Sequence, residues 1–188
     1  MIPIKEIDKT WTLFLDRDGV INQEKHLDYV HNWDEFKFYD GVKEACKVFS
    51  QLFKYIVVVT NQRGIGKGVT KLEDLLLIHQ NMKSEIEANG GKINQIYFCP
   101  DINSDSPNRK PNPGMAYMAK NDFPEIDFKK SIMIGNTISD MEFGKNIGAY
   151  TIFLSTTHPE ITVPDNRIDL KMSSLHEVAL HFLSLSIK

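Results

Sequence analysis

Two aspartates interrupt the first strongly apolar stretch of this 188-residue chain, WTLFLDRDGVIN at residues 11–22. Asp16 ends the apolar run, and Asp18 follows it just before Gly19, a residue that permits a tight backbone turn. Neighbouring carboxylates repel each other and are costly to bury, so something must compensate them. Mg2+ does so through oxygen ligands, together with water and a substrate phosphate. A carboxylate can also attack phosphorus, so Asp16 is a candidate nucleophile and Asp18 a candidate general acid and base.

Further polar groups follow the later apolar runs of the chain. In chain order they are Thr60, Asn61, Arg109, Lys110, Asn136 and Asp140. Phosphoryl transfer depends mainly on positioning and on stabilisation of charge. Thr60 offers a hydroxyl to a phosphate oxygen, and Lys110 offers a fixed positive charge. The set as a whole suits a divalent cation and a phosphate that are bound together.

The elements that must position these residues form an alternating pattern. Apolar runs bounded by turn residues predict strands at 12–16, 55–60, 93–98, 131–135 and 150–155. Amphipathic patterns predict helices over 41–53, 71–88, 139–147 and 173–186, and Asn112-Pro113 is typical of another helix start. This alternation predicts an α/β fold, with a mostly parallel central sheet covered on both faces, in a single domain over residues 1–188. Ligands bind beyond the carboxyl ends of such strands, so we expect the polar groups to meet there.

Four segments, in order, resemble the motifs of haloacid-dehalogenase-superfamily phosphatases. They are DRDGVIN, VVVTNQ, RKPNPGM and MIGNTISDM. Four ordered motifs are far more specific than a single pair of aspartates. The resemblance implies a Rossmann-like three-layer sandwich of the haloacid-dehalogenase (HAD) type, and the chain has no room for a large cap domain. It also implies Asp16 as nucleophile, Asp18 as acid and base, and Thr60 and Lys110 as the residues that hold the phosphate.

The same resemblance implies a Mg2+ site formed by Asp16, the backbone carbonyl of Asp18, and the fourth-motif pair Asn136 and Asp140. Relatives usually carry Asp where Asn136 stands. Asparagine keeps an oxygen ligand but removes one negative charge, so we expect weaker Mg2+ binding that Asp140 supports from the following helix. Many relatives also carry a zinc loop of three Cys and one His before the third motif. Only Cys99 remains of that set, and a structural zinc site needs four ligands, so no zinc is expected.

The segments FLDRDGVIN, DYVHNWDEFKFYDGV, TNQRGIGKG and RKPNPGM narrow the resemblance to D-glycero-D-manno-heptose 1,7-bisphosphate phosphatases. That subgroup also includes histidinol-phosphate phosphatases. The implied reaction is hydrolysis of a small sugar phosphate, at C7 of the heptose bisphosphate, through an aspartyl-phosphate. Arg109 matches the family arginine that meets the substrate, and Asn61 and Arg63 are further candidates for the sugar or its second phosphate. Two alternatives stay open: histidinol phosphate as substrate, and a module that accepts phosphoryl on Asp16 without turnover.

Composition limits the partners of this protein. Hydrophobic residues make up 41% of the chain, which is enough for a sizeable core, and the formal net charge is -3. Both signs of charge are mixed along the chain, which argues against general binding to nucleic acid or to a membrane surface. No apolar run approaches a membrane span, and the N-terminus, MIPIKEIDKT, does not resemble a signal peptide. We therefore expect a cytoplasmic monomer that acts on a small phosphorylated sugar.

Overall fold

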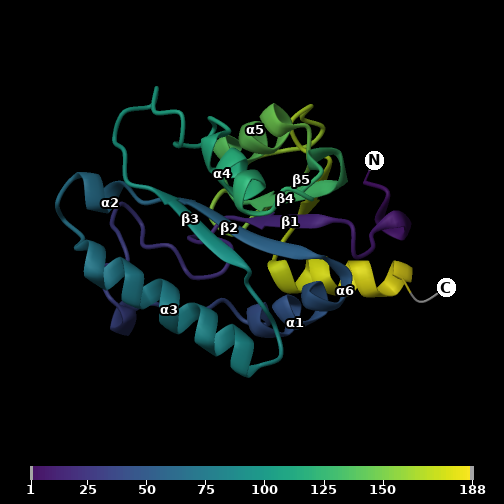
Figure 1. The fold of residues 1–188 in the computed structure, drawn as a ribbon, viewed down its shortest axis with the longest axis horizontal. Coiled ribbons are helices and arrows are strands. Elements are labelled where there is room, and N and C mark those ends of the chain that lie inside the picture. Colours follow the sequence, from purple (N-terminus) through teal and green to yellow (C-terminus); the bar gives the residue numbers. More distant parts are fainter. Residues whose placement is uncertain (1, 187–188) are drawn as a thin grey trace.

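A six-stranded parallel sheet forms the centre of the computed structural model, which describes residues 2–186 (Figure 1). The strand order is β3-β2-β1-β4-β5-β6. The strands are β1 Thr12–Leu15, β2 Tyr55–Asn61, β3 Gln95–Cys99, β4 Ser131–Gly135, β5 Tyr150–Leu154 and β6 Leu170–Met172. Five of these strands match the apolar runs of the sequence. The sixth, β6, has three residues and no fully buried position, so its sequence carries no strong strand signal.

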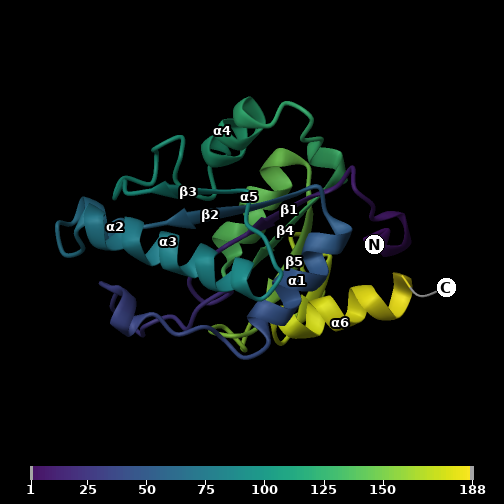
Figure 2. The same ribbon diagram turned by 60° about the horizontal axis from the view of Figure 1, so that its bottom comes forward.

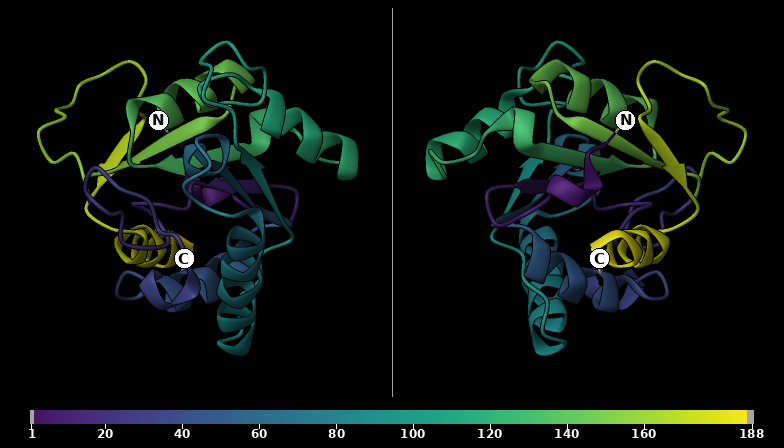
Figure 3. Two further views of the ribbon diagram at one scale, coloured as in Figure 1. Left: turned by 90° about the vertical axis from the view of Figure 1, so that its left-hand side faces the viewer. Right: turned by 90° about the vertical axis from the view of Figure 1, so that its right-hand side faces the viewer.

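Helices cover both faces of the sheet (Figures 2 and 3). The helices α1 Val42–Leu52, α3 Leu72–Ala88 and α6 Leu175–Ser186 lie on one face, and α4 Gly114–Asp122 and α5 Ile138–Ile147 lie on the other. The short helix α2 spans Arg63–Gly66, and single 3-10 turns occur at Ile4–Glu6, Trp33–Glu35 and Phe128–Lys130. This arrangement confirms the predicted three-layer α/β sandwich. No helix within residues 2–186 has both the length and the apolar character needed to cross a membrane.

The central strand β1 shows how the two cores form. Side chains alternate along a strand, so Leu13 and Leu15 pack in the layer of α1, α3 and α6. Phe14 points to the opposite layer, where its ring packs against Phe143 of α5 at a centroid distance of 6.4 Å. All four residues of β1 are buried. A strand that is covered on both faces needs a continuous apolar run, which explains why the first acid appears only at its end.

The carboxyl ends of β2, β1 and β4 lie side by side, because these strands are neighbours in the sheet. The ladder continues one residue beyond β1, where the backbone N–H of Asp16 donates to the carbonyl of Ile134 at 3.0 Å. Thr60 and Asn61 end β2, and Asn136 directly follows β4. The sheet thus brings together polar residues that are up to 120 positions apart in the sequence.

Candidate active site

A tight turn follows β1 and carries Asp16 to Gly19. The carbonyl of Arg17 accepts backbone hydrogen bonds from three consecutive residues, at 3.2, 2.8 and 3.2 Å, which closes the chain on itself. Gly19 has a φ of 80°, a conformation that favours glycine. A Cβ atom at Gly19 would lie 2.0 Å from Nδ2 of Asn136. Glycine is therefore required both by the turn and by the close approach of the side chain that follows β4.

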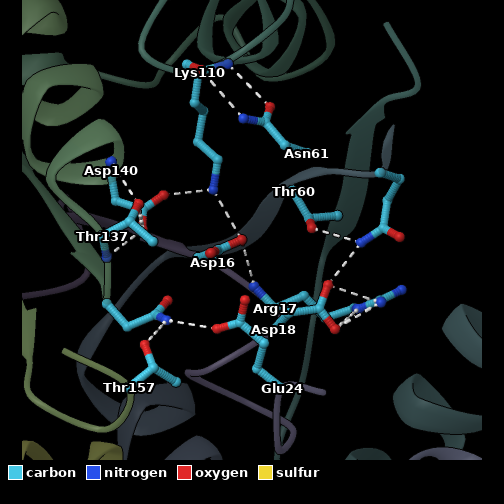
Figure 4. A network of polar contacts seen from close by, with 12 residues as sticks. Asp16, Arg17, Asp18, Glu24, Thr60, Asn61, Lys110, Thr137, Asp140 and Thr157 are labelled. Atoms are coloured by element: carbon cyan, nitrogen blue, oxygen red, sulfur yellow. Dashed lines mark hydrogen bonds and ion pairs between the residues drawn. The ribbon is translucent and has the colours of Figure 1, made fainter. Parts of the chain in front are cut away.

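Lys110 is the central cation of the site (Figure 4). Its Nζ lies 2.8 Å from Oδ1 of Asp16 and 2.6 Å from Oδ1 of Asp140, and only 3% of the residue is exposed. Burial alone would lower the pKa of Lys110, but the Asp140 and Asp16 carboxylates raise it above its usual value. The ammonium group therefore stays charged inside the protein, beside the acid at the end of β1.

The two oxygens of Asp16 have different surroundings. Oδ1 accepts from the backbone N–H of Arg17 at 2.7 Å and contacts Lys110, whereas Oδ2 has no hydrogen-bond partner within residues 2–186. Burial first, and then the charge of Asp140, raise the pKa of Asp16 to about 7, while Lys110 opposes the shift. One oxygen is thus fixed and the other is left available, in a position where an added cation would favour the ionised form.

Asp18 is held in a separate network of three donors. Nη2 of Arg17 lies 2.8 Å from both carboxylate oxygens, Nδ2 of Asn22 donates to Oδ1 at 2.9 Å, and Nε2 of Gln62 donates to Oδ2 at 2.8 Å. The same Gln62 amide also donates to the hydroxyl of Thr60 at 2.9 Å. Burial alone would raise the pKa of Asp18, but these donors, led by Arg17, lower it. Asp18 is therefore ionised and oriented by its partners.

Two polar residues hold Lys110 in place. The amide of Asn61 forms a pair of hydrogen bonds with the main chain of Lys110, accepting from its N–H at 3.0 Å and donating to its carbonyl at 3.1 Å. Thr137 caps α5, and the second oxygen of Asp140 accepts from the Thr137 backbone N–H at 3.0 Å and from its hydroxyl at 2.7 Å. Asn61 thus fixes the backbone of Lys110, and the cap fixes the carboxylate that holds its ammonium group.

The loop over 99–112 carries Arg109 and Lys110 and is tied by its own side chains. The amide of Asn112 donates to the carbonyls of Ser104 and Ser106 at 3.0 and 2.9 Å, and the hydroxyl of Ser106 donates to Asp101. Cys99, the one residue of the expected zinc-ligand set that the sequence contains, is a buried free thiol. Hydrogen bonds between neighbouring turns therefore tie the loop together.

A cavity of about 270 Å3 opens over these residues. Arg63 lines it, and its Nε atom is buried without a hydrogen-bond partner within residues 2–186. Arg109 does not line the cavity, and its Nη1 donates to the carbonyl of Asp101 at 3.1 Å. Burial first, and then the charge of Arg63, lower the pKa of Arg109, which places the two guanidinium groups within electrostatic reach of each other. The structure therefore gathers the catalytic candidates and Arg63 in one cavity, with Arg109 beside it.

The oxygen atoms at this edge of the sheet fit a hard cation. Asn136 is fully buried, and its Oδ1 atom has no hydrogen-bond partner in the described part of the chain. A buried polar atom without a partner is costly, and a metal ligand bond would satisfy it. Asp16, whose ionised form a cation would stabilise, lines the same cavity. The candidate donors combine a carboxylate with amide oxygen. Residues 2–186 contain no group of three or more His, Cys, Asp or Glu side chains that could hold a metal ion.

Several residues at the site lay outside the candidates chosen from the sequence. Arg17 and Gln62 hold Asp18, Thr137 holds Asp140, and Glu24 accepts from the amide of Asn136 at 3.3 Å. Arg17 and Gln62 both lie inside quoted motifs, between the two aspartates and after Thr60, so their position was a usable signal. Glu24 lies in a long connection with no regular pattern, and only the folded chain brings it to β4.

Comparison with known proteins places this architecture in a family. A family model described as polynucleotide kinase 3 phosphatase matches residues 12–157. The D-glycero-alpha-D-manno-heptose-1,7-bisphosphate 7-phosphatase of Mycobacterium tuberculosis is 38% identical over 140 residues, which cover 74% of each chain. This chain belongs to the haloacid-dehalogenase phosphatase family. The membership confirms that the four ordered motifs are those of a HAD phosphatase.

Other relatives extend the similarity over more of this HAD phosphatase. The enzyme of the same name from Campylobacter jejuni is 40% identical over 146 residues, which cover 78% of this chain and 83% of that one. The D-glycero-beta-D-manno-heptose-1,7-bisphosphate 7-phosphatase of Yersinia pestis is 34% identical and covers 88% of this chain and 92% of that one. Among solved structures, the D,D-heptose 1,7-bisphosphate phosphatase of B. bronchiseptica, complexed with magnesium and phosphate, has a TM-score of 0.81 at 25% identity. That match covers 93% of this chain and 98% of the other.

Proposed function

We propose that this phosphatase hydrolyses the C7 phosphate of D-glycero-D-manno-heptose 1,7-bisphosphate, with Mg2+ and through an aspartyl-phosphate on Asp16. The observation that carries the proposal is the position of Asp16, whose Oδ1 is fixed by Lys110 at 2.8 Å while Oδ2 has no partner within residues 2–186. The names of the relatives from M. tuberculosis, C. jejuni and Y. pestis support the substrate. The magnesium and phosphate in the B. bronchiseptica structure support the cofactor.

In the first step, Oδ2 of Asp16 attacks the phosphorus atom and the bond to the sugar oxygen breaks. Lys110 and the hydroxyl of Thr60 hold the non-bridging oxygens of the transferring group and stabilise their charge. The leaving alkoxide takes its proton from Asp18. Asp18 is ionised in the free protein, but the dianionic phosphate raises the pKa of a neighbouring carboxyl by repulsion, so substrate binding favours the protonated form.

In the second step, water cleaves the aspartyl-phosphate. Asp18, now ionised again, takes a proton from the attacking water, and Asp16 leaves as a carboxylate. The three donors from Arg17, Asn22 and Gln62 stabilise the ionised form that Asp18 has after it gives its proton to the sugar oxygen. The network around Asp18 therefore suits the base role directly and the acid role after the substrate has bound.

Three oxygen donors of this chain would hold Mg2+: the Asp16 carboxylate, the backbone carbonyl of Asp18 and Oδ1 of Asn136. A bound Mg2+ neutralises charge on the phosphate and offsets its repulsion of the attacking carboxylate. Asp140 was predicted as a further ligand, but both of its oxygens are engaged, one by Lys110 at 2.6 Å and the other by Thr137 at 2.7 Å. We therefore assign Asp140 the positioning of Lys110.

Arg63 and Arg109 are candidates for binding the second phosphate of the substrate. Arg63 lines the cavity, its Nε is buried without a partner within residues 2–186, and the charges of Arg63 and Arg109 interact. A phosphate between two guanidinium groups would relieve their mutual repulsion and form bidentate hydrogen bonds. Asn61 was also predicted to bind substrate, but its amide already holds both main-chain groups of Lys110, so we assign it a positioning role.

The test is phosphate release from a panel containing both anomers of the heptose bisphosphate and histidinol phosphate, with and without Mg2+. The expected result is Mg2+-dependent turnover of a heptose bisphosphate, lost in Asp16→Asn and Asp18→Asn. Preference for histidinol phosphate would replace the substrate assignment. Stoichiometric labelling of Asp16 without turnover would instead support a phosphate-accepting module, although a second acid at Asp18 is suited to hydrolysis.

We further infer that the protein is a single-domain monomer in the cytoplasm and that nucleic acid and membranes are not its partners. The mixed surface charge, with a formal net charge of -3, supports this inference. Light scattering of the purified chain tests the oligomeric state. Fractionation of cells that produce it tests the location, and a stable dimer or a membrane-bound fraction would contradict the inference.

A further inference from the structure

The orientation of the Asn136 amide is fixed by two acceptors. Its Nδ2 donates to the hydroxyl of Thr157 at 2.7 Å and to a carboxylate oxygen of Glu24 at 3.3 Å. A carboxylate can only accept, so the contact with Glu24 identifies this end of the amide as the NH2 group. The opposite end, Oδ1, is then the buried atom without a partner within residues 2–186. Glu24 and Thr157 thus direct an oxygen donor away from themselves.

Glu24 differs from the three aspartates of the site in its contacts with positively charged side chains. The other three carboxylates at the ends of β1 and β4 are each held by Arg17 or Lys110. Glu24 forms no ion pair within residues 2–186, although its side chain lines the same cavity. The cavity therefore contains a carboxylate that has no direct ion-pair partner and that contacts the neutral amide of Asn136.

We propose that Glu24 supports the Mg2+ site without binding the metal itself. Its carboxylate orients the Asn136 amide and supplies a negative charge that the amide lacks. The inference rests on the Mg2+ site of the proposed function and assigns Glu24 a role toward it. Outer-shell partners of metal ligands typically contribute 10- to 100-fold in metal affinity. Glu24 is an exposed residue, so solvent screens part of its charge, and we expect the lower end of that range.

Glu24→Gln separates charge from orientation, because a glutamine oxygen can still accept from the Asn136 amide. In titration calorimetry of Mg2+ into the full chain without substrate, this variant should raise the Kd about tenfold. Thr157→Val removes the second acceptor without a change of charge, so its effect should be smaller. Asp28→Asn is the matched control, because Asp28 is an exposed carboxylate that lines the same cavity without contacting Asn136. It should change the Kd by less than about twofold, since its charge is screened by solvent.

A second background tests whether the two positions share one role. In Asn136→Asp the ligand itself carries the charge and has no NH2 group to orient, so the added Glu24→Gln should change the Kd by less than about threefold. The same loss in both backgrounds would overturn the inference, and so would a Kd for Glu24→Gln within twofold of the unsubstituted protein. Asp16→Asn separates this inference from the proposed function. If it too leaves Mg2+ binding unchanged, the proposed metal site itself is wrong, whereas a loss only in Asp16→Asn rejects Glu24 alone.

Discussion

Replacement of His79 by glutamine should remove a pH-dependent part of the stability of this protein. His79 lies in α3 with 6% of its surface exposed, and its Nε2 is 3.2 Å from Nη1 of Arg17. Arg17 has only donors, so His79 must accept and therefore be neutral. Burial first, and then the charge of Arg17, lower the pKa of His79 to about 3. A charged imidazole would repel the guanidinium group that holds Asp18.

The magnitude follows from proton linkage. In the unfolded chain His79 has the ordinary pKa of about 6.5, so below this pH the unfolded state binds a proton that the folded state does not. Stability from the neutral His79 is therefore present above pH 6.5 and is lost as the pH falls toward 3. Integration over the two pKa values gives a loss of about 2 kcal/mol between about pH 7.5 and pH 5. Glutamine accepts from Arg17 but does not titrate, so His79→Gln should escape this loss.

Urea unfolding of both proteins across this pH range measures the difference directly. The raised pKa of Asp16 changes stability in the opposite direction over part of the same range, but it does so in both proteins and cancels in the comparison. His26→Gln is the matched control, because His26 is exposed, and its curve should parallel that of the unsubstituted protein. Parallel curves for His79→Gln would refute the reasoning, since they would mean that His79 is not held neutral by its surroundings.

Three further substitutions test other parts of the site. Lys110→Met should lower kcat at saturating Mg2+ by at least about 100-fold, because the transferring group loses a buried positive charge, and a loss below tenfold would contradict this role. Asp18→Asn should lower kcat by about 10²- to 10⁴-fold for an alkyl phosphate. The loss should be much smaller for p-nitrophenyl phosphate, because its leaving group needs no proton. Equal losses for the two substrates would count against Asp18 as the general acid. Thr137→Ala removes the cap of α5 and should lower the free energy of unfolding by about 1 kcal/mol in urea, so an unchanged stability would argue against the cap.

The fold was largely predictable because burial on both faces leaves a strong signal in the sequence. The strands β1 and β4 are buried at every position, and both appear as continuous apolar runs that end at a polar residue. Parallel strands share one direction, so the ends of those runs had to meet at one edge of the sheet. The shared location of Asp16, Thr60 and Asn136 was predicted in this way. β6 escaped prediction because it is a short strand at the edge of the sheet, where burial imposes no pattern.

The detailed pairing within the site could not be predicted in the same way. Asn61 appeared to be a substrate-binding candidate because it follows Thr60, yet its amide holds the main chain of Lys110, 49 positions later. Asp140 was predicted as a metal ligand, and its oxygens contact Thr137 and Lys110, which supports the positioning role that we propose for it. Sequence position shows which residues reach the same edge of the sheet. It does not show which donor faces which acceptor, because that depends on side-chain directions in the folded chain.

The contacts around Lys110 also bear on the expectation that the 99–112 loop binds no zinc. The proposed mechanism requires the loop to hold Lys110 close to Asp16, and a metal bound in the loop would be one way to limit its motion. Here the Asn61 amide ties the backbone of Lys110 to the end of β2, and the Asn112 amide ties two turns of the loop together. The ammonium group of Lys110 is fixed by ion pairs with Asp16, at the end of β1, and with Asp140, in α5. Position is thereby transmitted from rigid elements to the lysine through hydrogen bonds and ion pairs, so these contacts by themselves can hold the ammonium group beside the carboxylate at the end of β1.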